Sequence, residues 1–155
     1  MSTNTERTLI IVKPDGVQRA LVAEILGRLE RRGFKIAGMK MIRLDRPLAE
    51  RHYAVHQGKF FYDDLVKYIT MSPVVVAVLE GPNVIEVVRA MLDKTRPNEA
   101  APGTIRGDYA LEGLRNLMHA SDAPETAQSE IALYFKDDEL FSYERELDRW
   151  VLGDQ

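Results

Sequence analysis

The sequence predicts an α+β sandwich in which helices cover a four-stranded antiparallel sheet. Two observations lead to this prediction. Short β-branched or apolar runs alternate with segments whose apolar residues recur at helical spacing. One of these runs, residues 73–79 (PVVVAVL), is apolar on both faces, which is typical of a central strand with helices on either side.

The N-terminal half begins with a strand and a helix. The β-branched run at residues 8–12 ends at the turn signal KPDG, residues 13–16. Apolar residues at helical spacing then predict a helix that begins near Leu21 and stops at Gly33. The elements that lead on to the central strand are a strand, a helix opened by a proline and a short helix, at residues 34–42, 47–56 and 65–69.

The C-terminal half opens with a helix for which Asn83 is the expected N-cap. Periodicity disappears over residues 93–115, a length at which a loop is usually functional or disordered, and this one carries Arg, Lys, Thr and Asn side chains. A short strand at 117–119 follows. Asp122, with Glu125 three residues later, predicts a capping box at the start of the next helix.

The resulting order is β-α-β, then helices, then β-α-β with a trailing helix, which is that of a split βαβ, or ferredoxin-like, domain. We expect a single domain over residues 1–155, with residues 1–6 as a flexible N-terminus. Residues 135–155 are expected to form a C-terminal extension that packs on the domain or on an oligomer interface, because exposed apolar patches usually mark interfaces. The apolar side chains of this extension are Phe135, Leu140, Phe141, Tyr143, Leu147, Trp150 and Val151.

Composition limits the classes of function. The 155 residues include 21 Lys+Arg and 24 Asp+Glu, and the net charge of -3 gives no support for a nucleic-acid partner. The absence of cysteine excludes disulfides and thiolate sites. No apolar run approaches the ~20 residues that cross a bilayer, and the N-terminal residues do not resemble a targeting segment. We therefore expect a cytoplasmic protein with no membrane partner.

Common phosphate and metal motifs are missing. The sequence contains no GxxxxGK[ST], no GxGxxG and no protein-kinase signature. His52 and His56 have the spacing of one helix face, but Tyr53 stands where the zincin pattern HExxH has its glutamate. We interpret the pair as structural or as lying on the substrate side, and we predict no metal held by the protein itself.

His119 is the strongest catalytic candidate. It stands at the end of a short apolar strand and directly before a helix start, where anions and catalytic side chains collect in α/β sandwiches. A lone histidine in this setting is more often structural. The neighbourhood of Lys13, Thr104, Arg106 and Asn116 favours the functional interpretation.

Three stretches, in one register along the chain, resemble the nucleoside diphosphate kinase family: KPDGVQR at residues 13–19, PGTIRGD at 102–108 and RNLMHASD at 115–122. The resemblance runs from about residue 6 to 150. It implies a ferredoxin-like enzyme in which a histidine takes the γ-phosphoryl group of a nucleoside triphosphate, typically ATP, and passes it to a nucleoside diphosphate by a ping-pong route with little base specificity. Mg²⁺ would arrive with the nucleotide phosphates. The alternative is a nucleotide-binding or phosphohistidine relay protein of the same fold without turnover.

By this match the nucleophile is His119. Glu130 would accept a hydrogen bond from the other ring nitrogen, Ser121 would support that pair, and Tyr53 would support Lys13. The residues implied in nucleotide binding are Lys13, Phe61, Arg89, Thr95, Arg106 and Asn116, with Phe61 stacking on the base. The chemistry is consistent with this, because an ordinary imidazole has a pKa of about 6.5 and can attack at pH 7 without a separate base.

Three residues depart from the family pattern. Ala120 stands where glycine is usual, Ala123 where serine is common, and Arg96 where asparagine is typical. Small side chains at the first two positions should leave the turn intact. The resemblance also implies a homo-oligomer, a hexamer with a tetramer as the alternative, because a Tyr143…Trp150 ending resembles that of the hexameric members.

Overall fold

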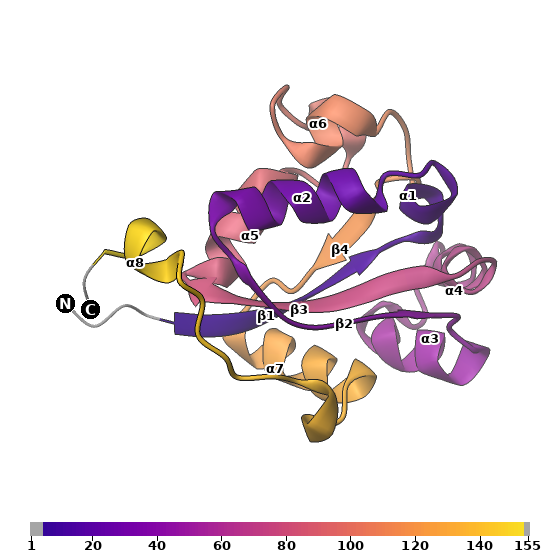
Figure 1. The fold of residues 1–155 in the computed structure, drawn as a ribbon. Coiled ribbons are helices and arrows are strands. Elements are labelled where there is room, and N and C mark those ends of the chain that lie inside the picture. Colours follow the sequence, from indigo (N-terminus) through magenta and orange to yellow (C-terminus); the bar gives the residue numbers. More distant parts are fainter. Residues whose placement is uncertain (1–4, 154–155) are drawn as a thin grey trace.

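The computed structural model describes residues 5–153 and shows a sheet with helices on both of its faces (Figure 1). Four strands form one antiparallel sheet in the order β2-β3-β1-β4. The strands are β1 (Thr5–Val12), β2 (Lys35–Ile42), β3 (Val74–Pro82) and β4 (Met118–Ala120). The predicted ferredoxin-like α+β fold class is confirmed, and the run that is apolar on both faces belongs to β3, inside the sheet.

The α-helices are α1 (Pro14–Gln18), α2 (Val22–Arg32), α3 (Arg46–His52), α4 (Tyr62–Thr70), α5 (Val84–Leu92), α6 (Ile105–Tyr109), α7 (Pro124–Tyr134) and α8 (Asp148–Val151). Short 3-10 helices lie at η1 (Ala54–His56), η2 (Pro97–Glu99) and η3 (Asp137–Glu139). Within residues 5–153, no helix is long and apolar enough to span a membrane.

Alternation along the strands divides the core into two layers. Ile10 and Val12 of β1 point to the face covered by α2 and α5, where they join a cluster with Ile25. Leu9 and Ile11 point to the other face and join a cluster formed with α3, α4 and α7. Figure 1 shows α2 and α5 on one side of the sheet and α3 and α7 on the other.

The KPDG segment is not an open turn. It continues into α1, in which Pro14 occupies the first turn and Lys13 is the extended N-cap residue. Proline at that position is pre-organised for a helix, and the first turn of a helix and a type I turn have similar dihedral angles, so the sequence signal for the two is the same.

The predicted helix over residues 47–56 is interrupted. α3 ends at His52, Tyr53 leaves helical geometry at φ -97° and ψ 19°, and η1 follows. His52 and His56 therefore do not share one helix face, and the prediction that they do is wrong. The His52 ring centroid lies 4.7 Å from that of His119, whereas the His56 ring lies 5.4 Å from Phe61.

One of the two predicted helix caps is confirmed in position. Asn83 is the N-cap residue of α5, although its backbone is left-handed (φ 52°) and its side chain makes no capping hydrogen bond. Ala123, not Asp122, precedes α7, so the predicted capping box is wrong. Pro124 begins that helix instead, because it needs no N–H partner there.

The segment 93–115 contains the helices η2 and α6, which are too short to produce a periodic pattern. Thr104 caps α6 through a hydrogen bond that its hydroxyl accepts from the N–H of Gly107 at 3.0 Å. This cap fixes the first turn of α6, which carries Arg106.

The C-terminal extension packs alongside β2. Phe135 and Leu140 pack in the cluster under α3 and α7, the Phe141 N–H donates to the Ala37 carbonyl at 2.8 Å, and the Tyr143 hydroxyl donates to the Ile36 carbonyl at 2.6 Å. Its large exposed side chains in this single chain are Phe141, Tyr143, Leu147, Trp150 and Val151.

At the other end, β1 begins at Thr5, so residues 5–6 of the predicted flexible N-terminus belong to a strand. The rest of that predicted segment, residues 1–4, lies outside the described residues.

Candidate active site

His119 projects from β4 on the opposite face to its neighbours. Met118 and Ala120 are buried in the core beside α2 and α5, and alternation along the strand turns His119 toward α7. Its Nε2 atom lies 2.8 Å from Oε2 of Glu130, a hydrogen-bond distance, although the angle is not that of a well-aligned bond. The ring nitrogen that does not face this carboxylate is Nδ1.

Glu130 is held in a charged state. The Ser121 hydroxyl donates to its other oxygen, Oε1, at 2.6 Å. Burial by itself raises the pKa of Glu130, but the contacts with His119 and Ser121 outweigh burial and keep the pKa below its ordinary value. A carboxylate at neutral pH therefore faces Nε2 of the histidine.

Lys13 lies where β1 ends, and it is joined to the segment before β4. Its ammonium donates to Oδ1 of Asn116 at 2.9 Å, and the Asn116 amide donates to the Thr95 carbonyl at 3.2 Å. Burial, followed by repulsion from Arg106, lowers the pKa of Lys13 to about 8. A buried ammonium with this pKa gains from an anion beside it.

Arg106 and Arg89 add two more cations. The Arg106 guanidinium is buried and donates to the carbonyls of Asn116 at 3.0 Å and Met118 at 2.7 Å. Burial and then repulsion from Arg89 lower its pKa to about 10. Arg89, from α5, donates to the carbonyl of Ala120 at 3.2 Å. The cations thus surround the chain on both sides of His119, and their mutual repulsion favours an anionic ligand.

Among the described residues, the structure shows no direct contact that would assign roles to Phe61, the expected base-stacking residue, or to Tyr53, the expected support of Lys13. Phe61 stands at the start of α4 with its ring against His56 and Phe60. The Tyr53 ring packs on His52 at 4.7 Å, and its buried hydroxyl has no hydrogen-bond partner among residues 5–153. The expected support of Lys13 by Tyr53 is therefore not a hydrogen bond in this structure.

A strained turn links the cation group to His119. Leu117 has a φ of 75°, and the Met118 N–H donates across it to the Asn116 carbonyl at 2.9 Å, which makes a γ-turn. The carboxylate of Asp15 accepts from the Leu117 N–H at 3.1 Å and also contacts the Tyr68 hydroxyl. Asp15 and Tyr68 were not predicted as site residues, because the KPDG pattern accounts for an aspartate as a turn former.

His52 is the other residue whose position the sequence did not reveal. Its side chain is 2% exposed, and Nδ1 lies 3.9 Å from Oε2 of Glu130. Burial, and then repulsion from His119, lower the pKa of His52 to about 3, so the ring is neutral. The helical spacing gave a signal for a histidine pair, but the break at Tyr53 separates the two rings.

The departures from the family pattern are accommodated. Ala120 is not among the described residues with positive φ, so a side chain is tolerated where the family usually has glycine. Ala123 is the extended residue before α7. Arg96 is largely exposed, with Glu99 3.9 Å away.

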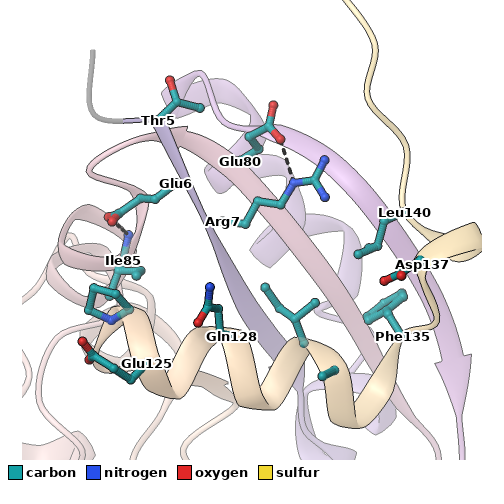
Figure 2. A pocket seen from close by; sticks show the side chains of 13 residues that line it. Thr5, Glu6, Arg7, Glu80, Ile85, Glu125, Gln128, Phe135, Asp137 and Leu140 are labelled. Carbon is teal, nitrogen blue, oxygen red and sulfur yellow. Dashed lines mark hydrogen bonds and ion pairs between the residues drawn. The ribbon is translucent and has the colours of Figure 1, made fainter. Parts of the chain in front are cut away.

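A pocket of about 630 Å³ lies elsewhere, between the start of β1, the end of β3 and α7. Figure 2 shows the Arg7–Glu80 ion pair on one side of it and the contact between Glu6 and the backbone of Ile85 on another. None of the predicted site residues lines this pocket. The histidine and the cations, rather than the size of a cavity, identify the candidate site.

The His119 imidazole is positioned by the Glu130 carboxylate, and cationic side chains bind the backbone on both sides of it. This arrangement suits the uptake and release of a phosphoryl group, which requires positioning and charge stabilisation more than covalent machinery. The fold and the site together place the protein among phosphoryl-transferring enzymes. A family model described as nucleoside diphosphate kinase matches residues 6–140. The chain belongs to the nucleoside diphosphate kinase family, and the predicted family and enzyme class are confirmed.

Individual relatives agree with this assignment. The chain is 59% identical over 148 residues to a nucleoside diphosphate kinase of Thermomicrobium roseum, covering 96% of this chain and 99% of the relative. A halophilic nucleoside diphosphate kinase from Halobacterium salinarum in complex with CDP superposes with a TM-score of 0.92 at 47% identity, covering 94% and 97% of the two chains. The enzyme from Borrelia burgdorferi with bound vanadate and ADP, a transition state mimic, has a TM-score of 0.92 at 36% identity, covering 97% and 99%.

Proposed function

We propose that the protein transfers the γ-phosphoryl group of a nucleoside triphosphate to a nucleoside diphosphate in two half-reactions through His119. The observation that carries this proposal is the orientation of the ring. Nε2 lies 2.8 Å from the Glu130 carboxylate, which leaves Nδ1 for the substrate. The CDP and the vanadate with ADP in the two related structures support nucleotide phosphates as the ligands.

In the first half-reaction, Nδ1 of neutral His119 attacks the γ-phosphorus. The N–P bond forms as the bond from phosphorus to the bridging oxygen breaks, and the nucleoside diphosphate leaves with the electron pair. The proton on Nε2 stays on the ring and faces Glu130, whose negative charge stabilises the positive charge that develops on the imidazole. In the second half-reaction, a terminal phosphate oxygen of another nucleoside diphosphate attacks the phosphorus, the N–P bond breaks and the ring returns to its starting state.

The cations bind and orient the phosphates. Lys13 and Arg106 are buried and both donate hydrogen bonds to Asn116, which belongs to the segment that leads to His119. They would neutralise the negative charge that spreads over the transferred phosphoryl group. Arg89 and Thr95 would contact the β-phosphate region, and Asn116, with Lys13, would contact phosphate and ribose.

Phe61 would stack on the base. Because every base has a π-face, stacking is tolerant of base identity, which gives an enzyme with little base specificity. The adenine and cytosine nucleotides in the two related structures are consistent with this tolerance.

Mg²⁺ would enter as part of the nucleotide substrate. Mg²⁺ prefers oxygen ligands and is commonly bound through one or two carboxylates and substrate phosphates. Among residues 5–153, the group of possible ligands that lie close together is His52, His119 and Glu130, two imidazoles and a single carboxylate, which is a poor match for this ion. The metal-stripped protein should therefore stay folded and lose turnover.

The test is incubation with γ-labelled ATP and Mg²⁺, followed by a chase with GDP. The protein should take up acid-labile, alkali-stable label and release it as GTP. His119→Ala should take up none, while the control His56→Ala should be labelled like the parent protein. A His119→Ala variant that turns over near the parental rate would overturn the assignment.

The same experiment separates the alternatives. A nucleotide-binding protein without turnover would bind ATP and never be labelled. A phosphohistidine relay protein would be labelled but would not pass the phosphate to GDP without an added protein.

We infer further that the chain assembles as a homohexamer, with a tetramer as the alternative. The exposed aromatic side chains of the C-terminal extension support an interface there, since apolar patches of this kind usually mark contacts between chains. A cytoplasmic location, expected because the sequence offers no targeting segment or membrane-spanning run, stays a prediction that cell fractionation can test.

A further inference from the structure

Several buried polar atoms without a well-aligned hydrogen bond lie around His52. Among residues 5–153 they are His52 Nδ1, Tyr53 Oη, Tyr134 Oη and His119 Nε2, the last of which is 2.8 Å from Oε2 of Glu130. Thr8 Oγ1 is also unpaired, but strand alternation places it on the other face of β1 from Leu9 and Ile11. The rings of Tyr53, His119 and Tyr134 lie 4.7, 4.7 and 5.7 Å from the His52 ring. Buried polar groups are normally paired, so a cluster of unpaired ones points to a water molecule or an ion bound between them.

Three of these side chains have the geometry of metal ligands. His52, His119 and Glu130 each offer one donor atom, and the three donor atoms lie within 4.8 Å of one another. Oε2 of Glu130 is 2.8 Å from Nε2 of His119 and 3.9 Å from Nδ1 of His52. Atoms this close together can share one zinc ion, whose bonds to nitrogen and oxygen are roughly 2.0–2.2 Å long, once the side chains adjust around it.

The burial of these side chains favours a bound ion over a chance grouping of side chains at the surface. The His52 side chain is 2% exposed and Glu130 is 13% exposed, so both donors reach the centre from inside the protein. They come from α3 and α7, on the same face of the sheet, while His119 comes from β4. A water molecule would supply the fourth ligand of a tetrahedral site.

We propose that His52, His119 and Glu130 form a site for one imidazole-preferring divalent cation of the Zn²⁺ type. Two imidazoles and one carboxylate suit Zn²⁺, Co²⁺ or Cu²⁺, whereas Mg²⁺ selects oxygen ligands. The site is distinct from the Mg²⁺ that accompanies the nucleotide, because it lies on the Nε2 side of His119, away from Nδ1.

This site makes the phosphoryl acceptor sensitive to transition metals, a consequence that rests on the proposed function. An ion bound at Nε2 takes the lone pair of that nitrogen and the carboxylate that would otherwise stabilise the developing charge. The proton of the neutral ring then resides on Nδ1, which has no free lone pair with which to attack phosphorus. Formation of the phosphoenzyme should slow in the presence of Zn²⁺ and recover when a chelator removes it.

The decisive measurement needs no nucleotide, so its failure is separable from a failure of the proposed function. The metal-stripped full chain is titrated with Co²⁺, whose visible d–d bands are intense in four-coordinate sites and weak in six-coordinate ones. We expect one Co²⁺ per chain with intense bands that Zn²⁺ displaces and excess Mg²⁺ does not.

Two variants provide the matched comparison. His52→Gln removes a proposed ligand and should weaken Co²⁺ binding by at least about tenfold. His56→Gln removes the other histidine of the same region, which lies outside the cluster, and should bind like the parent protein. Equal binding by the parent protein and His52→Gln, or a loss confined to His56→Gln, would overturn the proposal.

A measurement on the unaltered protein covers the case in which His52→Gln does not fold. With ¹⁵N-labelled histidine, Zn²⁺ should shift the His52 Nδ1 and His119 Nε2 resonances and leave those of His56 in place. Absence of both shifts at a saturating Zn²⁺ concentration, or binding of Co²⁺ with only weak six-coordinate bands, would show that the unpaired atoms enclose water.

Discussion

The carboxylate of Asp15 accepts a hydrogen bond at 3.1 Å from the backbone N–H of Leu117, which follows it by 102 positions in the chain. Leu117 is the residue with φ of 75° at the centre of the γ-turn between Asn116 and Met118. Left-handed backbone costs a leucine about 1–2 kcal/mol, so the turn needs such a partner to persist. Asp15 thereby positions the cation group and His119 relative to each other.

The first prediction concerns this contact. Asp15→Ala leaves the Leu117 N–H and the hydroxyl proton of Tyr68 without an acceptor in the interior, and each such unpaired donor costs about 1–3 kcal/mol. We expect the free energy of unfolding to fall by about 3 kcal/mol and kcat/KM to fall with it. Tyr68→Phe removes only one of the two partners and should cost less. Parental kcat/KM in a stably folded Asp15→Ala protein would show that the turn does not depend on Asp15.

The second prediction concerns pH. The pKa of Lys13, about 8 in the folded protein, lies below the ordinary value of 10.5 because of burial and of repulsion from Arg106. The free enzyme loses this ammonium as pH rises through about 8, so kcat/KM for the nucleotide should decline above that pH. Lys13→Arg should lower the rate but remove this limb of the profile, because arginine keeps its proton.

The lowered pKa of Lys13 also predicts how the free energy of unfolding changes with pH. Between pH 8 and 10.5 the folded protein binds fewer protons at Lys13 than the unfolded chain does, so the contribution of this group to the free energy of unfolding rises with pH across that window. Urea unfolding at pH 7.5 and 9.5 should show this contribution as a difference between the parent protein and Lys13→Met. A difference that is the same at both pH values would contradict the lowered pKa.

The third prediction concerns Arg106. Arg106→Ala should lower turnover by on the order of 10³, because it removes a positioned cation. It should also destabilise the fold by about 3 kcal/mol, because the carbonyls of Asn116 and Met118 lose their buried donor. Stopped-flow phosphorylation and thermal unfolding measure the two effects. Less than a tenfold loss of rate would remove Arg106 from the phosphate site.

The fourth prediction concerns assembly. Light scattering on the full chain should give a mass near six times 17.6 kDa. Deleting residues 142–155 removes the Tyr143–Ile36 contact and the exposed Trp150, so the assembly should weaken. Phosphorylation of His119 should persist, because His119, Lys13 and Arg106 lie outside the deleted stretch. A full-length monomer or tetramer at micromolar concentration would contradict the hexamer.

The sequence by itself determined the order of the four strands and the longer helices, the central strand and the identity of the family. These features depend on local signals. The apolar run in β3 needs only its own side chains, and Gly33 ends α2 through its own left-handed backbone (φ 118°). The motif around His119 is likewise contiguous, so a resemblance could be recognised without any knowledge of contacts.

Only the tertiary structure decided which distant residues share a site. In the sequence, Asp15 has the pattern of a turn former, and only the fold places its carboxylate against the Leu117 N–H. The spacing of His52 and His56 predicts a pair on one helix, but the helix ends before Tyr53 and the His52 ring packs against that of His119 instead. The positive φ of Leu117 has no local signal, because a leucine takes such a backbone only when surrounding contacts compensate its cost. Contacts across tens of residues are set by burial and by the pairing of polar groups in the folded chain, and neither quantity is defined along the sequence alone.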